Sequence, residues 1–254
     1  MEKDKIMKNL DNAKDHINEY SSFLAKMFGK LGKKISDAPF PQDLKKRFIS
    51  AAILIPIAVY AICLSQTLFF CISVVLTILM TAEWLELTKT AEDQKKWRLI
   101  GLLYIAIPIC CVIKIRMINS DILLWMFAVI WATDIFAFFS GKTFGGPKLA
   151  PKISPNKTWA GLAGGVLASM FIGLLSSAMF EGGILFFICI SAVLALIEQA
   201  GDLLESRFKR IFGVKDSGSI IPGHGGVLDR LDGMMSVAPA VLLFIVIFSK
   251  SFAS

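Results

Sequence analysis

The chain has 254 residues, of which 55% are hydrophobic and 19% are charged. Soluble domains are about 45–50% apolar with dispersed apolar residues, whereas here they are bunched into long runs, which excludes an ordinary soluble protein. A net charge of +7 would suggest a nucleic-acid partner for a soluble protein. In a membrane protein it reflects basic cytoplasmic loops instead, so we expect no nucleic-acid partner.

Residues 1–47 are polar and charged, and we interpret them as a cytoplasmic N-terminal tail ahead of a membrane-embedded catalytic domain, 48–254. Apolar residues recur at helical spacing within 17–35, which fits an amphipathic helix on the membrane surface. A partly disordered tail explains this composition equally well. No signal-peptide pattern precedes the first long apolar run, which begins near Phe48.

Seven apolar runs follow the tail, and each is long enough to suggest a transmembrane helix. They are approximately 48–66, 67–88, 99–113, 120–140, 159–180, 183–205 and 233–249. The third run is short, and glycines and prolines could divide the set into eight or nine helices. The predicted fold is therefore an all-α polytopic transmembrane bundle of seven to nine spans, with polar active-site loops facing the cytoplasm.

Lysines and arginines are concentrated in the N-terminal tail and in every second loop, between runs two and three, four and five, and six and seven. These loops share one side of the membrane, which the positive-inside rule assigns to the cytoplasm. The opposite loops are short and poor in charge, apart from Lys114 and Arg116. The N-terminus is therefore predicted to be cytoplasmic.

The five cysteines lie within apolar runs without metal-binding spacing, so we interpret them as packing residues.

Ionisable side chains inside membrane spans are costly and commonly functional, and carboxylates of runs four and six are candidates of this kind. Asp134 lies in run four, and Glu198, Asp202 and Glu205 close run six. Their i, i+4, i+7 spacing places the last three on one helical face. For Glu205, a hydrated position at the membrane interface is an equally good interpretation.

The segment 206–233, SRFKRIFGVKDSGSIIPGHGGVLDRLDG, combines basic residues, carboxylates and glycines between two spans. Carboxylates bind Mg²⁺, usually with substrate phosphates completing the shell, and Lys and Arg neutralise phosphate oxygens. Glycines let the backbone approach phosphates closely. Asp229 and Asp232 would share one side of a helical turn. The segment therefore predicts a site for a metal–polyphosphate complex, and the alternative is a solvated structural loop.

A second polar segment, 141–161, lies on the same predicted side. Its four lysines and three hydrogen-bonding residues are Lys142, Lys148, Lys152, Lys157, Ser154, Asn156 and Thr158. Its prolines predict an ordered, non-helical loop. The lysines are either phosphate ligands or positive-inside residues near the headgroups. Gly161 and Gly165 form a G-x-x-x-G pattern that indicates a close helix contact.

The polar segments resemble the phosphatidate cytidylyltransferase family, also called CDP-diacylglycerol synthases. The similar motifs are SRFKR at 206–210, KD at 215–216, HGG at 224–226 and DRLD at 229–232, with DIFAFFSGK at 134–142, LAPKISPNKTW at 149–159 and GDLLES at 201–206 upstream. Ala160 and Phe138 depart from the Glu and Tyr that many members carry. The first departure argues against an essential role for a carboxylate at that position in this chain.

The resemblance implies a nucleotidyltransferase that converts CTP and phosphatidic acid into CDP-diacylglycerol and pyrophosphate in phospholipid biosynthesis. It also implies Mg²⁺, with a monovalent cation such as K⁺ as an optional second ion, and a homodimer in the bilayer of a bacterial inner membrane. The residues expected to be catalytic are Asp202, Lys209, Arg210, Lys215, Asp216, His224, Asp229 and Arg230. Those expected to bind substrate are Asp134, Lys142, Lys152, Ser154, Lys157, Gly225 and Gly226. The expected metal ligands are Asp202, Asp229 and Asp232.

Two other functions are compatible with parts of the sequence. A CTP-dependent polyprenol-type lipid kinase would transfer the γ-phosphate and release CDP rather than pyrophosphate. An ion-coupled membrane transporter could use Asp134 and Asp202 as a coupling pair. A transporter would be expected to show related halves, which the sequence lacks, and it would leave the 206–233 segment unexplained.

Overall fold

A computed structural model describes residues 56–218 and 226–252. The predicted tail and most of the first predicted span, 48–66, lie outside these residues; within that span, residues 56–64 are helical. Six helices in the described part are long and apolar enough to cross a membrane. They confirm an all-α, multi-pass integral membrane protein.

The chain order of the elements is simple. It runs α3 (Gln66–Leu87), α4 (Gln94–Ile118), α5 (Ser120–Phe144), β1 (Lys148–Ala150), β2 (Ser154–Thr158), α6 (Trp159–Ser176), the 3₁₀ turn η1 (Ser177–Met179), α7 (Ile184–Ile211), α8 (Leu228–Ile247) and the 3₁₀ turn η2 (Ser249–Phe252). Polar side chains start several helices by accepting a bond from a first-turn N–H: Ser65 for α3, Asp93 for α4, Asn119 for α5 and Thr158 for α6.

Two expectations need correction. The third run is not short, because α4 covers 25 residues, beginning at Gln94 and continuing through Pro108 to Ile118. The 141–161 segment is not a plain loop either. Its first residues, including Lys142, complete α5, and β1 and β2 then pair as a short antiparallel hairpin. Apart from this hairpin, the described elements are helical.

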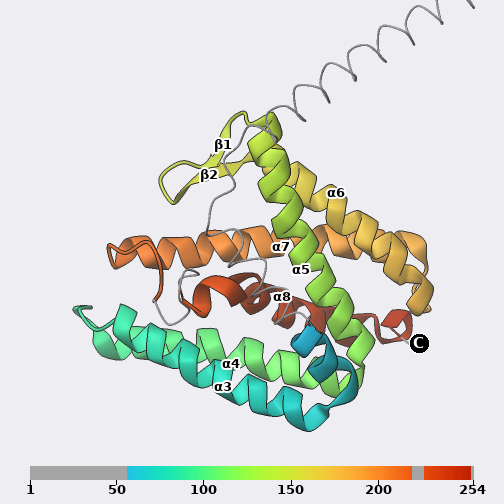
Figure 1. The fold of residues 1–254 in the computed structure, drawn as a ribbon, viewed down its shortest axis with the longest axis horizontal. Coiled ribbons are helices and arrows are strands. Elements are labelled where there is room, and N and C mark those ends of the chain that lie inside the picture. Colours follow the sequence, from blue (N-terminus) through green and yellow to red (C-terminus); the bar gives the residue numbers. More distant parts are fainter. Residues whose placement is uncertain (1–55, 219–225, 253–254) are drawn as a thin grey trace, which may run out of the picture. The chain divides into compact units, whose positions relative to one another are not determined.

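Neighbouring helices pack in a continuous series (Figure 1). α3 packs on α4, α4 on α8, α8 on α7, α7 on α6, and α6 on α5, while α5 also contacts α4, α7 and α8. Large apolar side chains such as Leu64, Leu185 and Val246 are more than 70% exposed on the outside of this bundle. Such a surface is a liability in water and is suited to the hydrocarbon core of a bilayer.

Two aromatic clusters mark opposite parts of the bundle. Trp125, Phe187 and Phe252 pack together where α5, α7 and η2 meet. Phe208 of α7 and Phe212, the residue that follows the helix, pack against Trp97 near the start of α4, with ring centroids 6.0 and 4.8 Å from that of Trp97. The second cluster brings the end of α7 to the α3–α4 turn, on the side where the polar segments gather.

Candidate active site

A polar cavity of about 540 Å³ lies where α5, the hairpin, α6 and α7 meet. This volume falls within the range of pockets that bind small ligands. Its polar lining residues are Asp134 and Lys142 of α5, Lys148 of β1, Ser154, Asn156, Lys157 and Thr158 of β2, and Gln199 and Asp202 of α7. The structure thus brings together five of the predicted site residues, Asp134, Lys142, Ser154, Lys157 and Asp202.

Glycines on α6 allow the helix to approach α5 beside this cavity. A Cβ at Gly161 would lie 2.8 Å from the carbonyl oxygen of Ala137, and one at Gly165 would lie 3.0 Å from that of Thr133. Any larger residue would therefore force the helices apart. The prediction that this G-x-x-x-G pattern makes a close helix contact is confirmed.

Lys157 and Asp202 form an ion pair at the cavity wall. Lys157 Nζ lies 2.5 Å from Asp202 Oδ2 and donates a hydrogen bond to Gln199 Oε1 at 3.0 Å. The side chains of Lys157 and Asp202 are only 17% and 23% exposed. Partial burial strengthens this attraction compared with a pair in open water, so the two groups hold each other in place.

Asp232 lies on α8, which packs against α7. A Cβ at Gly201 would collide with the Ser236 side chain, and one at Gly233 would lie 3.0 Å from Glu198 Cγ, so each glycine makes room for a side chain of the facing helix. At this crossing the charge of Asp232 interacts with those of Asp202, Asp134 and Lys209. Asp232 therefore links the cavity to a second charged group on α8.

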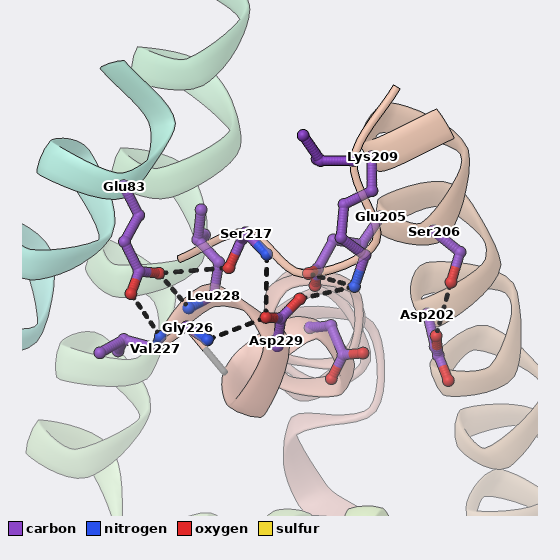
Figure 2. Close-up of polar contacts among 12 residues, drawn as sticks. Glu83, Asp202, Glu205, Ser206, Lys209, Ser217, Gly226, Val227, Leu228 and Asp229 are labelled. Atoms are coloured by element: carbon purple, nitrogen blue, oxygen red, sulfur yellow. Dashed lines mark hydrogen bonds and ion pairs between the residues drawn. The ribbon is translucent and has the colours of Figure 1, made fainter. Parts of the chain in front are cut away.

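Asp229 in the first turn of α8 is the centre of that second group (Figure 2). Its Oδ1 accepts a bond from Lys209 Nζ at 2.6 Å, and its Oδ2 accepts from the N–H groups of Ser217 at 3.0 Å and Gly226 at 2.9 Å. Lys209 also lies 3.2 Å from Glu205 Oε1. Asp229 thus ties the end of α7 and both flanks of the segment 219–225 to the start of α8.

Glu83 of α3 makes a similar set of contacts from the other side (Figure 2). Its Oε1 accepts from the N–H of Val227 at 2.7 Å, and its Oε2 accepts from the N–H of Leu228 at 2.9 Å and from Ser217 Oγ at 3.3 Å. The side chain is buried, with 3% exposure. A carboxylate at the positive end of α8 is favourable, since the first N–H groups of a helix lack partners within it.

Two of the three carboxylates on one face of α7, Glu198 and Glu205, are buried rather than hydrated. Glu198 is 0% exposed and accepts a bond from Gln199 Nε2 at 2.9 Å, and Glu205 is 3% exposed. A hydrated interfacial position for Glu205 is therefore wrong, because the side chain is buried beside Lys209, where its charge also interacts with those of Asp229 and Asp232 in α8. Burying a carboxylate is costly without a partner, and this lysine supplies one.

Other predicted site residues lie away from the cavity. Arg210 is exposed, and its guanidinium donates to the carbonyls of Ile153 in the hairpin turn and Val214 after α7, at 3.3 and 3.1 Å. Three further residues are exposed outside the cavity lining: Lys152 in the hairpin turn, and Lys215 and Asp216 after α7. The charge of Arg230 interacts with Asp134. His224 and Gly225 lie outside the described residues, whereas Gly226 is buried.

The carboxylates fit a magnesium ion that shares its shell with substrate. In the described part of the chain, no three His, Cys, Asp or Glu side chains are grouped closely enough to enclose a metal. Mg²⁺ is usually bound by one or two carboxylates, with substrate phosphates and waters as the other ligands. Asp202, which lines the cavity, and Asp232, whose charge interacts with that of Asp202, suit that pattern, whereas Asp229 already accepts three hydrogen bonds.

Sequence reasoning named the cavity residues Lys148, Asn156 and Thr158 only as members of a polar segment, and it did not single out Gln199 or Glu83. Gln199 is uncharged, so nothing in the pattern distinguished it from an ordinary helix residue. Glu83 could have been found, since it is an ionisable residue within an apolar run, the same signal that identified Asp134. Its place near the end of that run is equally compatible with a hydrated position, so the sequence alone does not distinguish it.

Fold and site define a multi-pass α-helical membrane protein with a lysine- and carboxylate-lined cavity of the kind that binds phosphates and divalent cations. The chain belongs to the cytidylyltransferase family, whose sequence pattern it matches over residues 112–248. It is 43% identical over 214 residues to the phosphatidate cytidylyltransferase of Rickettsia bellii (strain RML369-C), which covers 80% of this chain and 90% of the relative.

Two further relatives carry the same name. The Rickettsia felis (strain ATCC VR-1525 / URRWXCal2) protein is 42% identical over 215 residues, or 80% of this chain and 92% of the relative. The Brucella suis biovar 1 (strain 1330) protein is 39% identical over 180 residues, or 68% of this chain and 63% of the relative. The family resemblance inferred from the sequence motifs is confirmed.

Proposed function

We propose that this chain is a nucleotidyltransferase that transfers CMP from CTP to phosphatidic acid, giving CDP-diacylglycerol and pyrophosphate for phospholipid biosynthesis. The observation that carries the proposal is the cavity in which Lys157 and Asp202 pair between membrane helices. It is found in a chain similar along most of its length to relatives named phosphatidate cytidylyltransferase. Neither a lipid kinase nor a transporter is favoured by any feature of the site.

The reaction needs alignment and charge neutralisation more than a protein nucleophile. A phosphate oxygen of phosphatidic acid attacks the α-phosphorus of CTP, the bond from that phosphorus to the bridging oxygen breaks, and pyrophosphate leaves. Lys157, Lys142 and Lys148 line the cavity and would neutralise phosphate oxygens. Ser154 and Asn156 would orient the substrates by hydrogen bonding, which brings the reacting atoms into line.

Asp202 and Asp232 would hold Mg²⁺, with K⁺ as an optional second ion. When bound, the ion neutralises phosphate charge and makes the attacked phosphorus more electrophilic. Asp202 would then exchange part of its contact with Lys157 for the ion, freeing the lysine for a phosphate. Asp229 stays a sequence-based candidate ligand, but its three bonds to N–H donors favour a role in fixing the start of α8.

The enzyme would act in a bacterial inner membrane with its polar cavity and N-terminus on the cytoplasmic side, where CTP is available. The lysine-rich hairpin beside the cavity supports this orientation under the positive-inside rule. We expect a homodimer, as the family resemblance implies.

Product analysis tests the proposal. Purified protein in detergent is given phosphatidic acid, Mg²⁺ and CTP labelled at either the α- or the γ-phosphate. We expect α-label in a lipid product and γ-label in pyrophosphate. γ-Label in the lipid would identify a kinase and overturn the proposal. The proposal would also be overturned if folded wild-type protein left CTP unconsumed.

A further inference from the structure

Glu83 is a buried carboxylate that belongs neither to the cavity nor to the part of the chain covered by the family pattern, 112–248. Burial of an ionised carboxylate costs free energy unless donors satisfy it. Here three donors do so: the N–H groups of Val227 and Leu228 at the start of α8, and the hydroxyl of Ser217 after α7. One side chain on α3 therefore holds both flanks of the 219–225 segment.

The chain around Glu83 is shaped to keep these contacts short. A Cβ at Gly226 would lie 2.7 Å from Glu83 Oε2, and one at Gly218 would lie 3.0 Å from Glu83 Oε1. Side chains at these two positions would push the backbone away from the carboxylate. Glycine at both positions thus permits the approach that the hydrogen bonds require.

Glu83 and Asp229 share Ser217. The serine N–H donates to Asp229 Oδ2, while its hydroxyl donates to Glu83 Oε2 (Figure 2). The first turn of α8, which carries Asp229 and leads to Asp232, is therefore fixed from α7 through Lys209 and from α3 through Glu83. Loss of the Asp229 carboxylate would release this turn from α7, and loss of the Glu83 carboxylate would release it from α3.

We propose that Glu83 is a positioning residue for the reaction, which holds the start of α8 so that Asp229 and Asp232 keep their places relative to α7. The inference rests on the proposed function. Glu83 does not line the cavity, so it acts through α8 rather than through contact with CTP or lipid. Its removal should lower the rate of the chemical step more than substrate affinity.

The test compares Glu83→Gln with Glu86→Gln. Glutamine keeps the volume of Glu83 but turns an N–H₂ group toward Val227 or Leu228, so one backbone donor loses its acceptor. Glu86 lies three residues further along α3, is 74% exposed and pairs only with Lys89 among the described residues, which makes it a matched control. Each purified variant is assayed for kcat, for KM of CTP and phosphatidic acid, and for thermal unfolding.

We expect Glu83→Gln to lower kcat at least tenfold per folded molecule, with both KM values within twofold of wild type. Glu86→Gln should match wild type. An unchanged kcat in folded Glu83→Gln would overturn the proposal, as would a loss explained entirely by a smaller folded fraction. If Glu83→Gln is not recovered folded, Ser217→Ala decides: a two- to fivefold lower kcat supports the role, and wild-type kcat overturns it.

Hydrogen–deuterium exchange separates this inference from the proposed function. The amides of Val227 and Leu228 should exchange at least tenfold faster in Glu83→Gln than in wild type or Glu86→Gln. Unchanged exchange would overturn the anchoring whatever the reaction. Wild-type protein that shows the expected protection but makes no lipid-linked CMP would instead defeat the proposed function.

Discussion

Lys157 is the cavity cation whose position is most firmly fixed, by Asp202 at 2.5 Å and by Gln199 at 3.0 Å. We expect Lys157→Ala to lower kcat/KM at least tenfold, because a charge-assisted bond contributes about 1.5–3 kcal/mol. Lys95→Ala, at an exposed position near the start of α4, is the control and should be neutral. Steady-state kinetics of both variants check this, and equal activity would remove Lys157 from the binding site.

Asp229 is the second residue whose substitution is informative. Asp229→Asn removes the charge opposite Lys209 and presents N–H₂ where N–H donors or the lysine need an acceptor. We expect turnover to be abolished in a protein that still elutes as a folded species, with its thermal midpoint lowered. Near-normal activity of the folded variant would show that Asp229 is not required for the reaction.

Single residues were predictable from sequence where a charge stands against apolar surroundings. Asp134 and Asp202 were found this way, and the cavity brings them together. The partners of these charges were not predictable, because Lys157 reaches Asp202 across 45 positions of sequence and only the folded chain sets that distance. The partners of Glu83 were not predictable for the same reason, since its donors Ser217 and Val227 are more than 130 positions away in the sequence.

At the scale of elements, the α7–α8 crossing depends on Gly201. Gly201→Ala places a methyl group against Ser236, and such overpacking typically costs about 1–3 kcal/mol. We expect a lower thermal midpoint and reduced turnover, because Asp202 and Asp232 separate. Adding Ser236→Gly should restore part of both. A fully stable, active Gly201→Ala protein would show that the crossing is looser than described.

Helix ends were less predictable than helix cores. Hydropathy marked 99–113, whereas α4 begins at Gln94 because Asp93 caps it by accepting from the N–H of Lys96 at 3.0 Å. α8 likewise begins at Leu228, five residues before its apolar run. Glu83 accepts a hydrogen bond from the N–H of Leu228, and Asp229 accepts one from the N–H of Gly226, just before the helix. Polar residues extend a membrane helix when they satisfy its end.

At the scale of the whole described bundle, the polar loops gather on one side. Arg210 joins the end of α7 to the hairpin, and Trp97 packs on Phe212, so the three charged loops meet as alternate spans predict.

Cysteine labelling tests this topology. Lys95→Cys, Lys152→Cys and Lys215→Cys, each made in a cysteine-free protein, should react with an impermeant maleimide only after cells are opened. A cysteine at 114 should react in intact cells, and the reverse pattern would invert the topology.

The most direct test of the central claim is transfer of α-labelled CMP to phosphatidic acid by wild type, Asp202→Asn and Glu181→Gln, assayed side by side with Mg²⁺. Glu181 is an exposed control in the turn between η1 and α7. Wild type and Glu181→Gln should form labelled lipid at equal rates, and folded Asp202→Asn should form at least a hundredfold less. Labelled lipid produced by Asp202→Asn at the wild-type rate would contradict the account.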